Sequence, residues 1–158
     1  MKTYSTIFVV FCFLIFLSGC SEAPFYENVQ SFDGNEWKQT QKPTFEVDIT
    51  DIKKSYDFVL TVRTSTSYKY NNLWIFWATT TPDGQTVREP FELKITNPDG
   101  SWHGNNSGTI VENQLRFSSR RMPLKGKYKF IIEQGITQPS IDNVLDIGFK
   151  IEVSPAEY

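Results

Sequence analysis

Apolar and polar residues alternate along several short segments of the chain. The alternation runs from Phe45 to Thr50 and again from Tyr56 to Arg63, where Val59 is the exception. It returns over residues 91–95 and 145–153. A period of two places apolar side chains on one face of an extended strand. We therefore predict strands that bury one face and expose the other.

Residues 73–78 follow a different pattern, because Leu-Trp-Ile-Phe-Trp-Ala is apolar at every position. A run of this kind is typical of a central strand that is covered on both sides. We therefore predict a strand here with both faces in the core.

Turn signals separate the predicted strands. Pro-Asp-Gly occurs at residues 82–84 and 98–100, where proline presets φ and glycine accepts a left-handed backbone. Residues 110–117 suggest a further hairpin, and no segment carries a sustained helical apolar stripe. Seven or eight short strands predict an all-β fold, a single antiparallel β-sandwich of the jelly-roll or Ig-like kind, over residues 42–158.

The N-terminus carries the features of an export signal. Lys2 precedes an unbroken apolar run of 11 residues, from Ile7 to Leu17. A membrane-spanning helix needs about 20 apolar residues, so this run fits a signal-peptide core better than a permanent anchor. Residues 17–20, Leu-Ser-Gly-Cys, resemble the lipobox of bacterial lipoproteins. We predict that residues 1–19 are a signal peptide removed before Cys20.

Cys20 is the predicted lipidation site. Its thiolate is a strong nucleophile for a diacylglyceryl group, and the lipobox resemblance implies acylation of the new amino terminus, giving an N-palmitoyl and S-diacylglycerol cysteine. Each buried methylene contributes about 0.8 kcal/mol, so several acyl chains hold a protein on a membrane lastingly. An ordinary secretory signal with a chance cysteine is the alternative.

The residues after Cys20 set the expected location. Ser21 stands where an aspartate would favour inner-membrane retention in Gram-negative bacteria, so we expect an outer-membrane anchor facing the periplasm. Residues 20–41 lack a clear period and contain Pro24 and Asp33-Gly34. We predict that this stretch is a lipidated tether leading into the domain.

Composition narrows the classes of partner. Of the 158 residues, 39% are hydrophobic and 15% aromatic, and the net charge is −2. One packed domain is expected from this length and composition. Binding to a phosphate backbone needs clustered Lys and Arg, so we expect no nucleic acid partner. Cys12 leaves with the signal peptide, so no internal disulfide is expected.

The usual catalytic constellations are missing from the sequence. His103 is the only histidine, and no Gly-x-Ser-x-Gly motif accompanies it. Zinc requires three or four Cys, His or carboxylate ligands. Glu89 and Glu92 lie three apart on a predicted strand and therefore point to opposite faces, unlike a glycosidase pair. We predict that the chain is not an enzyme and has no metal or cofactor.

Aromatic residues remain the candidates for binding. Three glycines frame Trp102 and His103, either to present Trp102 to a sugar or partner or to form a turn with Trp102 tucked beneath it. More aromatics surround residues 73–78, and exposed rings stack on sugars and anchor protein interfaces. The predicted interaction surface consists of Trp102, His103, Tyr68 and Tyr70.

Five motifs in order resemble one family. They are Tyr56-Asp-Phe-Val-Leu-Thr-Val-Arg63, Tyr68-Lys-Tyr70-Asn-Asn-Leu73, Asp99-Gly-Ser-Trp102-x-Gly104-x-x-x-Gly108, Tyr128-x-Phe-x-Ile-x-Gln134 and Asp146-Ile-Gly148-x-x-Ile151-Glu152. Together with the lipobox they resemble the GldH family of gliding-motility lipoproteins from the Bacteroidetes, over residues 56–152. The order and spacing of the motifs carry the resemblance.

The resemblance implies a cell-envelope lipoprotein needed for gliding and connected with type IX secretion. The family supplies no catalytic residues, so only the acylation site, Cys20, is carried over. We therefore expect an outer-membrane-anchored, non-enzymatic component that contacts other envelope proteins of this machinery. A surface or periplasmic carbohydrate-binding lipoprotein is the alternative, since a sandwich with exposed aromatics suits sugars equally well.

Overall fold

The computed structural model describes residues 23–155, which form β-strands and one short 3-10 turn, η1 (Asp33–Asn35). The strands are β1 (Tyr26–Ser31), β2 (Glu36–Lys38), β3 (Thr44–Ile49), β4 (Ser55–Ser65), β5 (Asn72–Thr80), β6 (Thr86–Lys94), β7 (Asn105–Ser107), β8 (Ile110–Arg121), β9 (Gly126–Gln134), β10 (Ser140–Asp142) and β11 (Val144–Val153).

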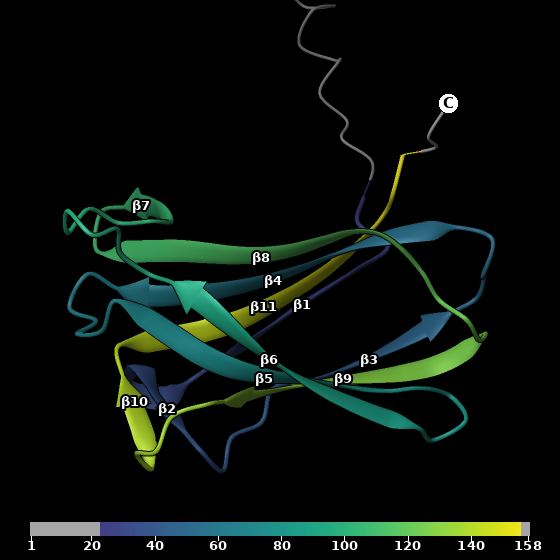
Figure 1. Ribbon diagram of the computed structural model, residues 1–158, viewed down its shortest axis with the longest axis horizontal. Coiled ribbons are helices and arrows are strands. Elements are labelled where there is room, and N and C mark those ends of the chain that lie inside the picture. The colour runs from purple at the N-terminus through teal and green to yellow at the C-terminus, as the bar shows by residue number, and fades with distance from the viewer. Residues whose placement is uncertain (1–22, 156–158) are drawn as a thin grey trace, which may run out of the picture.

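Two sheets form the body of the domain. One has five strands in the order β1-β11-β4-β8-β7, and the other has four in the order β3-β9-β5-β6. Every neighbouring pair is antiparallel. The two sheets lie face to face, and a small β2–β10 pair sits beside them (Figure 1). The predicted antiparallel β-sandwich is confirmed.

Aromatic rings fill the space between the sheets. The ring of Phe149, on the five-stranded sheet, lies 5.0 Å from Phe130, 5.2 Å from Phe45 and 5.4 Å from Trp77, measured between ring centroids. Such pairs add about 0.5–1.5 kcal/mol each beyond their buried area. Among residues 23–155, every buried apolar residue lies between Phe32 and Ile151.

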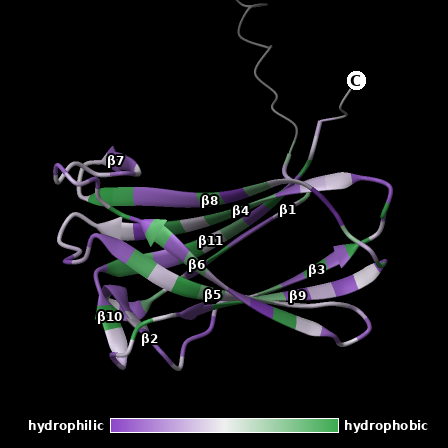
Figure 2. Cartoon of the chain, viewed as in Figure 1, coloured by the Kyte–Doolittle hydropathy of each residue, from purple (hydrophilic) through white to green (hydrophobic). Residues whose placement is uncertain are grey.

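The alternating segments at residues 45–50 and 56–63 behave as predicted. Phe45, Val47 and Ile49 are buried on β3 while the residues between them are exposed. The even-numbered residues of β4 from Tyr56 to Val62 are likewise buried, and Val59 is buried on the other face. Figure 2 shows the resulting change between hydrophobic and hydrophilic positions along the strands.

The prediction for residues 73–78 is wrong in one respect. They form most of β5, which lies between β9 and β6, but the side chain of Trp74 is 44% exposed. Only one face of this sheet packs on the other sheet, and no further layer of the described chain covers its outer face. There the Arg88 guanidinium lies 3.5 Å from the centroid of the Phe76 ring, a cation–π contact that shields part of it.

The predicted tether is folded over much of its length. Within residues 20–41, β1 pairs with β11 over six residues and β2 pairs with β10. Phe32 and Trp37 are buried and stack with centroids 5.2 Å apart. The domain therefore begins near Tyr26, not at residue 42, because these apolar side chains cover core that the later strands leave open.

The predicted hairpin at residues 110–117 is one continuous strand. β8 runs for 12 residues along β4, and their register shifts between Tyr56 and Phe58. Ser119 has φ of +53° beside this shift, which marks a β-bulge near the end of β8.

The connecting segments gather at two ends of the sandwich (Figure 1). Strand pairing brings Ile49 opposite Gly126 and Ser55 opposite Arg121 at one end. We call this the entry end; it holds residues 23–25, 50–54, 81–85, 122–125 and 154–155. The opposite end, called the far end, carries residues 66–71, 95–104 and 135–143.

Candidate functional site

The four residues of the predicted interaction surface all lie at the far end, but Tyr68 is not on the surface. Its side chain is only 7% exposed, and its hydroxyl donates a hydrogen bond to the carbonyl of Asn72 at 3.1 Å. Burial raises the pKa of Tyr68, so the hydroxyl stays protonated and acts as a donor. Tyr68 is therefore a structural residue of this loop.

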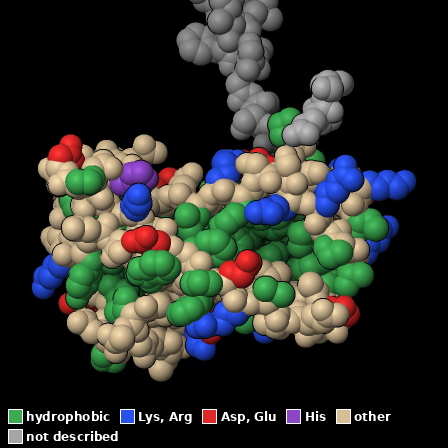
Figure 3. All heavy atoms as spheres, in the orientation of Figure 1, with side chains coloured by type: hydrophobic (Ala, Val, Ile, Leu, Met, Phe, Trp, Pro, Cys, Tyr) green, Lys and Arg blue, Asp and Glu red, His purple; other side chains and the backbone are tan. Residues whose placement is uncertain are grey.

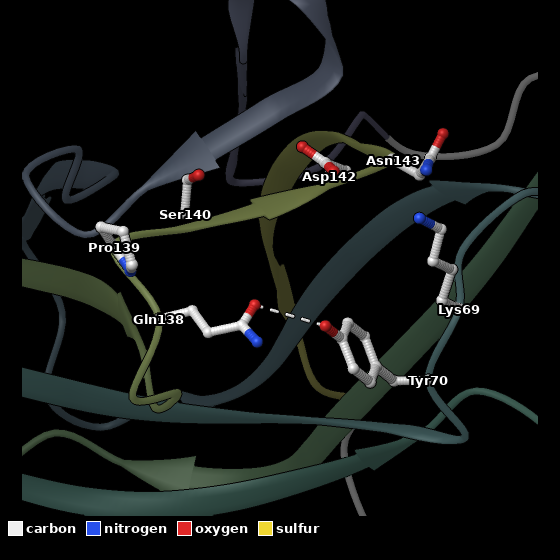
Figure 4. Close-up of a pocket in the computed structure, with 7 residues that line it drawn as sticks. All are labelled: Lys69, Tyr70, Gln138, Pro139, Ser140, Asp142 and Asn143. Atoms are coloured by element: carbon white, nitrogen blue, oxygen red, sulfur yellow. Dashed lines mark hydrogen bonds between the residues drawn. The ribbon is translucent and has the colours of Figure 1, made fainter.

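Tyr70 is exposed beside it. The two tyrosine rings meet edge to face, with centroids 5.6 Å apart and planes at 71°. The side chain of Tyr70 is 45% exposed, and its hydroxyl donates to Oε1 of Gln138 at 3.3 Å (Figure 4). This contact joins the loop after β4 to the segment after β9, two regions 68 residues apart in the chain.

A small polar hollow surrounds this contact. It measures about 250 Å³ and is lined by Lys69, Tyr70, Gln138, Pro139, Ser140, Asp142 and Asn143 (Figure 4). Of these residues, only Tyr70 belongs to the predicted interaction surface. The hollow offers hydrogen-bonding groups and a single ring, so it has too little apolar surface to anchor a partner by itself.

Trp102 forms part of a turn against the core. It pairs with Thr96 through an isolated β-bridge and packs, partly buried, against the core cluster. The turn is closed by the Asn97 amide, which donates to the carbonyl of Ser101 at 2.8 Å. The geometry therefore favours the structural interpretation of Trp102 over a ring presented to a ligand.

His103 is exposed and held at the side of this turn. Its Nδ1 lies 3.2 Å from Oδ1 of Asn97, and its amide donates to the carbonyl of Ile95 at 2.9 Å. The next position, Gly104, has no room for a side chain, because a Cβ there would overlap the backbone carbonyl of Glu112 on β8. Close packing against β8 explains this glycine without a binding role.

A second, larger candidate lies between the sheets, at the edge where β6 and β8 face each other without pairing. It is an open cleft of about 360 Å³ with an apolar floor, visible as hydrophobic side chains in the hollow at the middle of the face (Figure 3). We call it the aromatic cleft; it is lined by Phe58, Trp77, Thr79, Glu89, Phe91, Phe117, Arg120, Arg121, Met122 and Phe130.

Three rings form the accessible part of the aromatic cleft. Phe91 on β6 and Phe117 on β8 are half-buried, with centroids 5.1 Å apart. The ring of Trp77 lies beneath them, 5.2 Å from Phe117 and almost perpendicular to it. The alternating pattern predicts Phe91 on an inner face, but no sequence signal shows that a gap between two edge strands leaves Phe91 and Phe117 partly exposed.

The strand edges beside the aromatic cleft differ. β7 covers β8 only along Ile110–Glu112, so the rest of β8 has β4 on one side and, within the described chain, no strand on the other. β6 carries Pro90, a residue that sheets tolerate at an edge because it has no N–H to donate. The edge of β8 is therefore the more open to a further strand.

Charged side chains occupy the rim of the aromatic cleft. Glu89 lines it from β6, whereas Glu92 lies on the outer face and accepts a hydrogen bond from Nδ2 of Asn72 at 2.6 Å. The two carboxylates thus point to opposite faces, as predicted. Neither Arg120 nor Arg121 has a carboxylate within 4.0 Å among residues 23–155.

The other kinds of site find no counterpart in residues 23–155. No group of three or more His, Cys, Asp or Glu side chains there is arranged to hold a metal ion. No helix in that range is long and apolar enough to cross a membrane. A sugar platform would need coplanar exposed rings, and the Tyr68–Tyr70 pair is edge to face. Cys20, the predicted lipidation site, lies outside the described residues.

The chain matches known proteins over almost its whole length. The family model described as GldH lipoprotein matches residues 24–151. A gliding motility lipoprotein GldH homolog from Christiangramia forsetii is 27% identical over 98% of this chain and 99% of its own length. The gliding motility lipoprotein GldH of Flavobacterium johnsoniae is 30% identical, covering 87% of this chain and 90% of that protein.

A solved structure gives a weaker comparison. The C-terminal domain of EclA, a sugar-binding protein, aligns with 87% of this chain and 84% of its own at 14% identity, with a TM-score of 0.32. That score is too low to support a shared fold or ligand. The family match and the two full-length relatives agree with the predicted resemblance, and the chain therefore belongs to the GldH lipoprotein family.

Proposed function

We propose that the chain is a non-enzymatic component of the gliding motility and type IX secretion apparatus. In this proposal acyl chains on Cys20, including an N-palmitoyl group, hold it at the outer membrane facing the periplasm. The names of its relatives support the link to gliding motility. The aromatic cleft is the observation that carries its role, because it gives the domain a surface suited to another envelope protein.

The aromatic cleft suits an extended segment of that partner. A strand added along the open edge of β8 would bond to its unpaired backbone groups, as in β-strand addition. An apolar side chain of the segment would then lie on Phe91 and Phe117, whose rings contact each other edge to face with centroids 5.1 Å apart. The bulge at Ser119 interrupts regular pairing, so the usable edge is short.

The test replaces side chains of the aromatic cleft in the chromosomal copy. Phe91→Ala and Phe117→Ala should reduce colony spreading, the amount of secreted protein, or both, while the level of the protein in the envelope stays near wild type. Trp74→Ala is the matched control, because Trp74 is an exposed ring on the outer face of the other sheet. We expect it to behave as wild type.

A third variant of the aromatic cleft distinguishes a loss of function from a loss of stability. Glu89→Lys reverses a charge on the rim of the aromatic cleft without removing core volume, so it should impair spreading or secretion in a stably folded protein. If deletion of the gene impairs these phenotypes but all three cleft variants keep wild-type behaviour, the proposed docking role of the aromatic cleft is wrong.

The anchor is tested separately. Cys20→Ala should leave an uncleaved precursor, and mass spectrometry of the native protein should find cleavage before Cys20 with acyl groups on that residue. A mature protein that starts elsewhere, or that carries an unmodified Cys20, would contradict the proposed membrane attachment.

A further inference from the structure

The entry end exposes an unusual amount of apolar surface. Of the eight large apolar side chains that are exposed within the described chain, four lie at this end. They are Phe25 at 39%, Ile52 at 39%, Leu124 at 37% and Val153 at 40%. They come from four different segments that the fold places at one end, where Phe25 and Val153 line the same hollow. Clustered exposed apolar residues mark contact with a partner or a membrane.

Cationic side chains lie among these apolar ones. Lys53 and Lys54 follow Ile52, and Lys125 follows Leu124. Arg120 and Arg121 end β8 at the same end, where Arg121 pairs in register with Ser55. None of these five side chains has a carboxylate within 4.0 Å in the part of the chain that the structure covers.

One of the nearby acidic side chains is paired with a cation, and another accepts a backbone hydrogen bond. Asp57 is paired with Arg116 at 3.3 Å and accepts a hydrogen bond from the amide of Ser119 at 2.9 Å. Asp51 accepts a hydrogen bond from the amide of Lys53 at 2.9 Å. Lys53, Lys54, Arg121 and Lys125 are therefore cations without a carboxylate partner among the described residues, while Asp51 and Asp83 contribute negative charge at this end.

The charged surface is continuous with the start of the described chain. Lys54 lines one hollow with Ala23, Phe25 and Val153. It lines a second hollow with Lys53 and Arg121. We call this surface the entry-end patch; it consists of Phe25, Ile52, Lys53, Lys54, Arg121, Leu124, Lys125 and Val153.

We propose that the entry-end patch seats the domain on an anionic phospholipid membrane. The apolar side chains would lie at the depth of the headgroups, and the Lys and Arg side chains would bind lipid phosphates. Interleaved apolar and basic residues have this behaviour in peripheral membrane proteins. Each Lys or Arg near an anionic surface contributes about 1 kcal/mol, so Lys53, Lys54, Arg121 and Lys125 together give an attraction that Asp51 and Asp83 offset only in part.

The distance from the anchor supports this orientation. Cys20 is the acylated residue in the proposed function, on which this step depends. Ala23 is three positions after Cys20 in the chain, and an extended chain spans at most about 3.3–3.6 Å per residue. The entry end is therefore held within roughly 10 Å of the membrane surface. Contact of the entry-end patch with that surface needs no further change in the fold.

The membrane interaction can be measured without the anchor. The test uses the chain from Ser21 onward, which lacks Cys20 and keeps the whole core. We expect it to co-sediment with vesicles of phosphatidylglycerol and phosphatidylethanolamine in equal parts, and only weakly with pure phosphatidylcholine. Sodium chloride should weaken the binding, and inorganic phosphate should weaken it no more than sodium chloride of equal ionic strength.

Variants identify the surface responsible. The triple variant Lys53→Gln, Lys54→Gln, Lys125→Gln should lower binding to the anionic vesicles by about a hundredfold. The control variant Lys38→Gln, Lys69→Gln, Lys94→Gln removes the same charge from the far end and should bind as wild type. Ile52→Ser with Leu124→Ser should also weaken binding, because it removes the apolar part of the patch.

Several outcomes would overturn this inference. Failure of the wild-type chain to bind anionic vesicles would do so, as would equal binding to phosphatidylcholine. Equal loss of binding in the two lysine triple variants would assign the interaction to net charge alone. The chain from Ser21 onward carries no acyl group, and the vesicle experiment contains no partner protein. These results are therefore independent of the tests of Cys20 and of the aromatic cleft.

Discussion

Gln134 of β9 donates a buried hydrogen bond from Nε2 to the main-chain carbonyl of Trp37 on β2, at 3.0 Å. The two residues are 97 positions apart in the sequence. Trp37 is itself fully buried, and its indole N–H donates to the carbonyl of Gln41 at 2.8 Å. This contact fastens the N-terminal segment to the four-stranded sheet and makes residues 26–38 part of the folded domain.

Replacing Trp37 should therefore destabilise the whole domain. Trp37→Ala removes a fully buried ring that stacks on Phe32, and we expect the free energy of unfolding to fall by about 3–5 kcal/mol. Urea unfolding followed by circular dichroism measures this change. Trp74→Ala is the matched control, since Trp74 is 44% exposed, and it should cost about 1 kcal/mol or less. Equal costs for the two variants would contradict the placement of Trp37.

Gly104 should tolerate no side chain. In Gly104→Ala the new Cβ would overlap the backbone carbonyl of Glu112, so the loop or the β8 edge must shift. We expect a loss of about 1–3 kcal/mol in the free energy of unfolding. Gly108→Ala is a useful comparison because Gly108 has φ of +64° but open space around it. It should cost about 1–2 kcal/mol from backbone strain alone, and Gly108→Asn should recover part of that.

Glu133 should make stability depend on acid pH. Hydrogen bonds from Lys42, at 2.8 Å, and from Arg88 hold the pKa of Glu133 below the ordinary value of 4.5. The ionised carboxylate thus stabilises the fold above pH 4.5, and this contribution is lost as the pH falls through the lower folded pKa. Glu133→Gln should cost about 1 kcal/mol or less at neutral pH, because both cations are largely exposed.

The measurement for Glu133 is urea unfolding at a series of pH values. The gap between wild type and Glu133→Gln should close as the pH falls below 4.5. Glu27→Gln, on the exposed outer part of β1, changes the net charge equally and should follow the wild-type profile. A gap for Glu133→Gln that stays constant from neutral to acid pH would argue against an ionic contribution.

The two tyrosines of the far end should differ sharply. Tyr68→Ala removes a side chain that is only 7% exposed, and it leaves the Asn72 carbonyl without the hydroxyl that donates to it. We expect a loss of about 3–5 kcal/mol. Tyr70→Ala should cost about 1 kcal/mol or less, since its ring is 45% exposed. Thermal unfolding of the two variants compares them directly, and similar losses would place Tyr70 in the core as well.

Local sequence determined the strands of the alternating segments, and it predicts the chemistry of the N-terminus. The direction of a side chain on a strand follows from the backbone at that residue, so alternation over residues 45–49 and 56–62 predicts the buried face correctly. The signal-peptide pattern and Cys20 are also local, because they are recognised in an extended chain. The ordered motifs between residues 56 and 152 indicated the family that the comparisons confirm.

Only the tertiary structure decided which apolar faces are covered. The run at residues 73–78 is apolar throughout, yet Trp74 faces solvent because no layer of the described chain lies on that side of β5. Trp37 appeared in an irregular segment, yet it is fully buried because β2 packs beside β10 and β9. The aromatic cleft and the entry-end patch likewise join residues from distant segments. The burial of a side chain depends on such neighbours, whereas the alternation of side chains between two faces depends only on the strand that carries them.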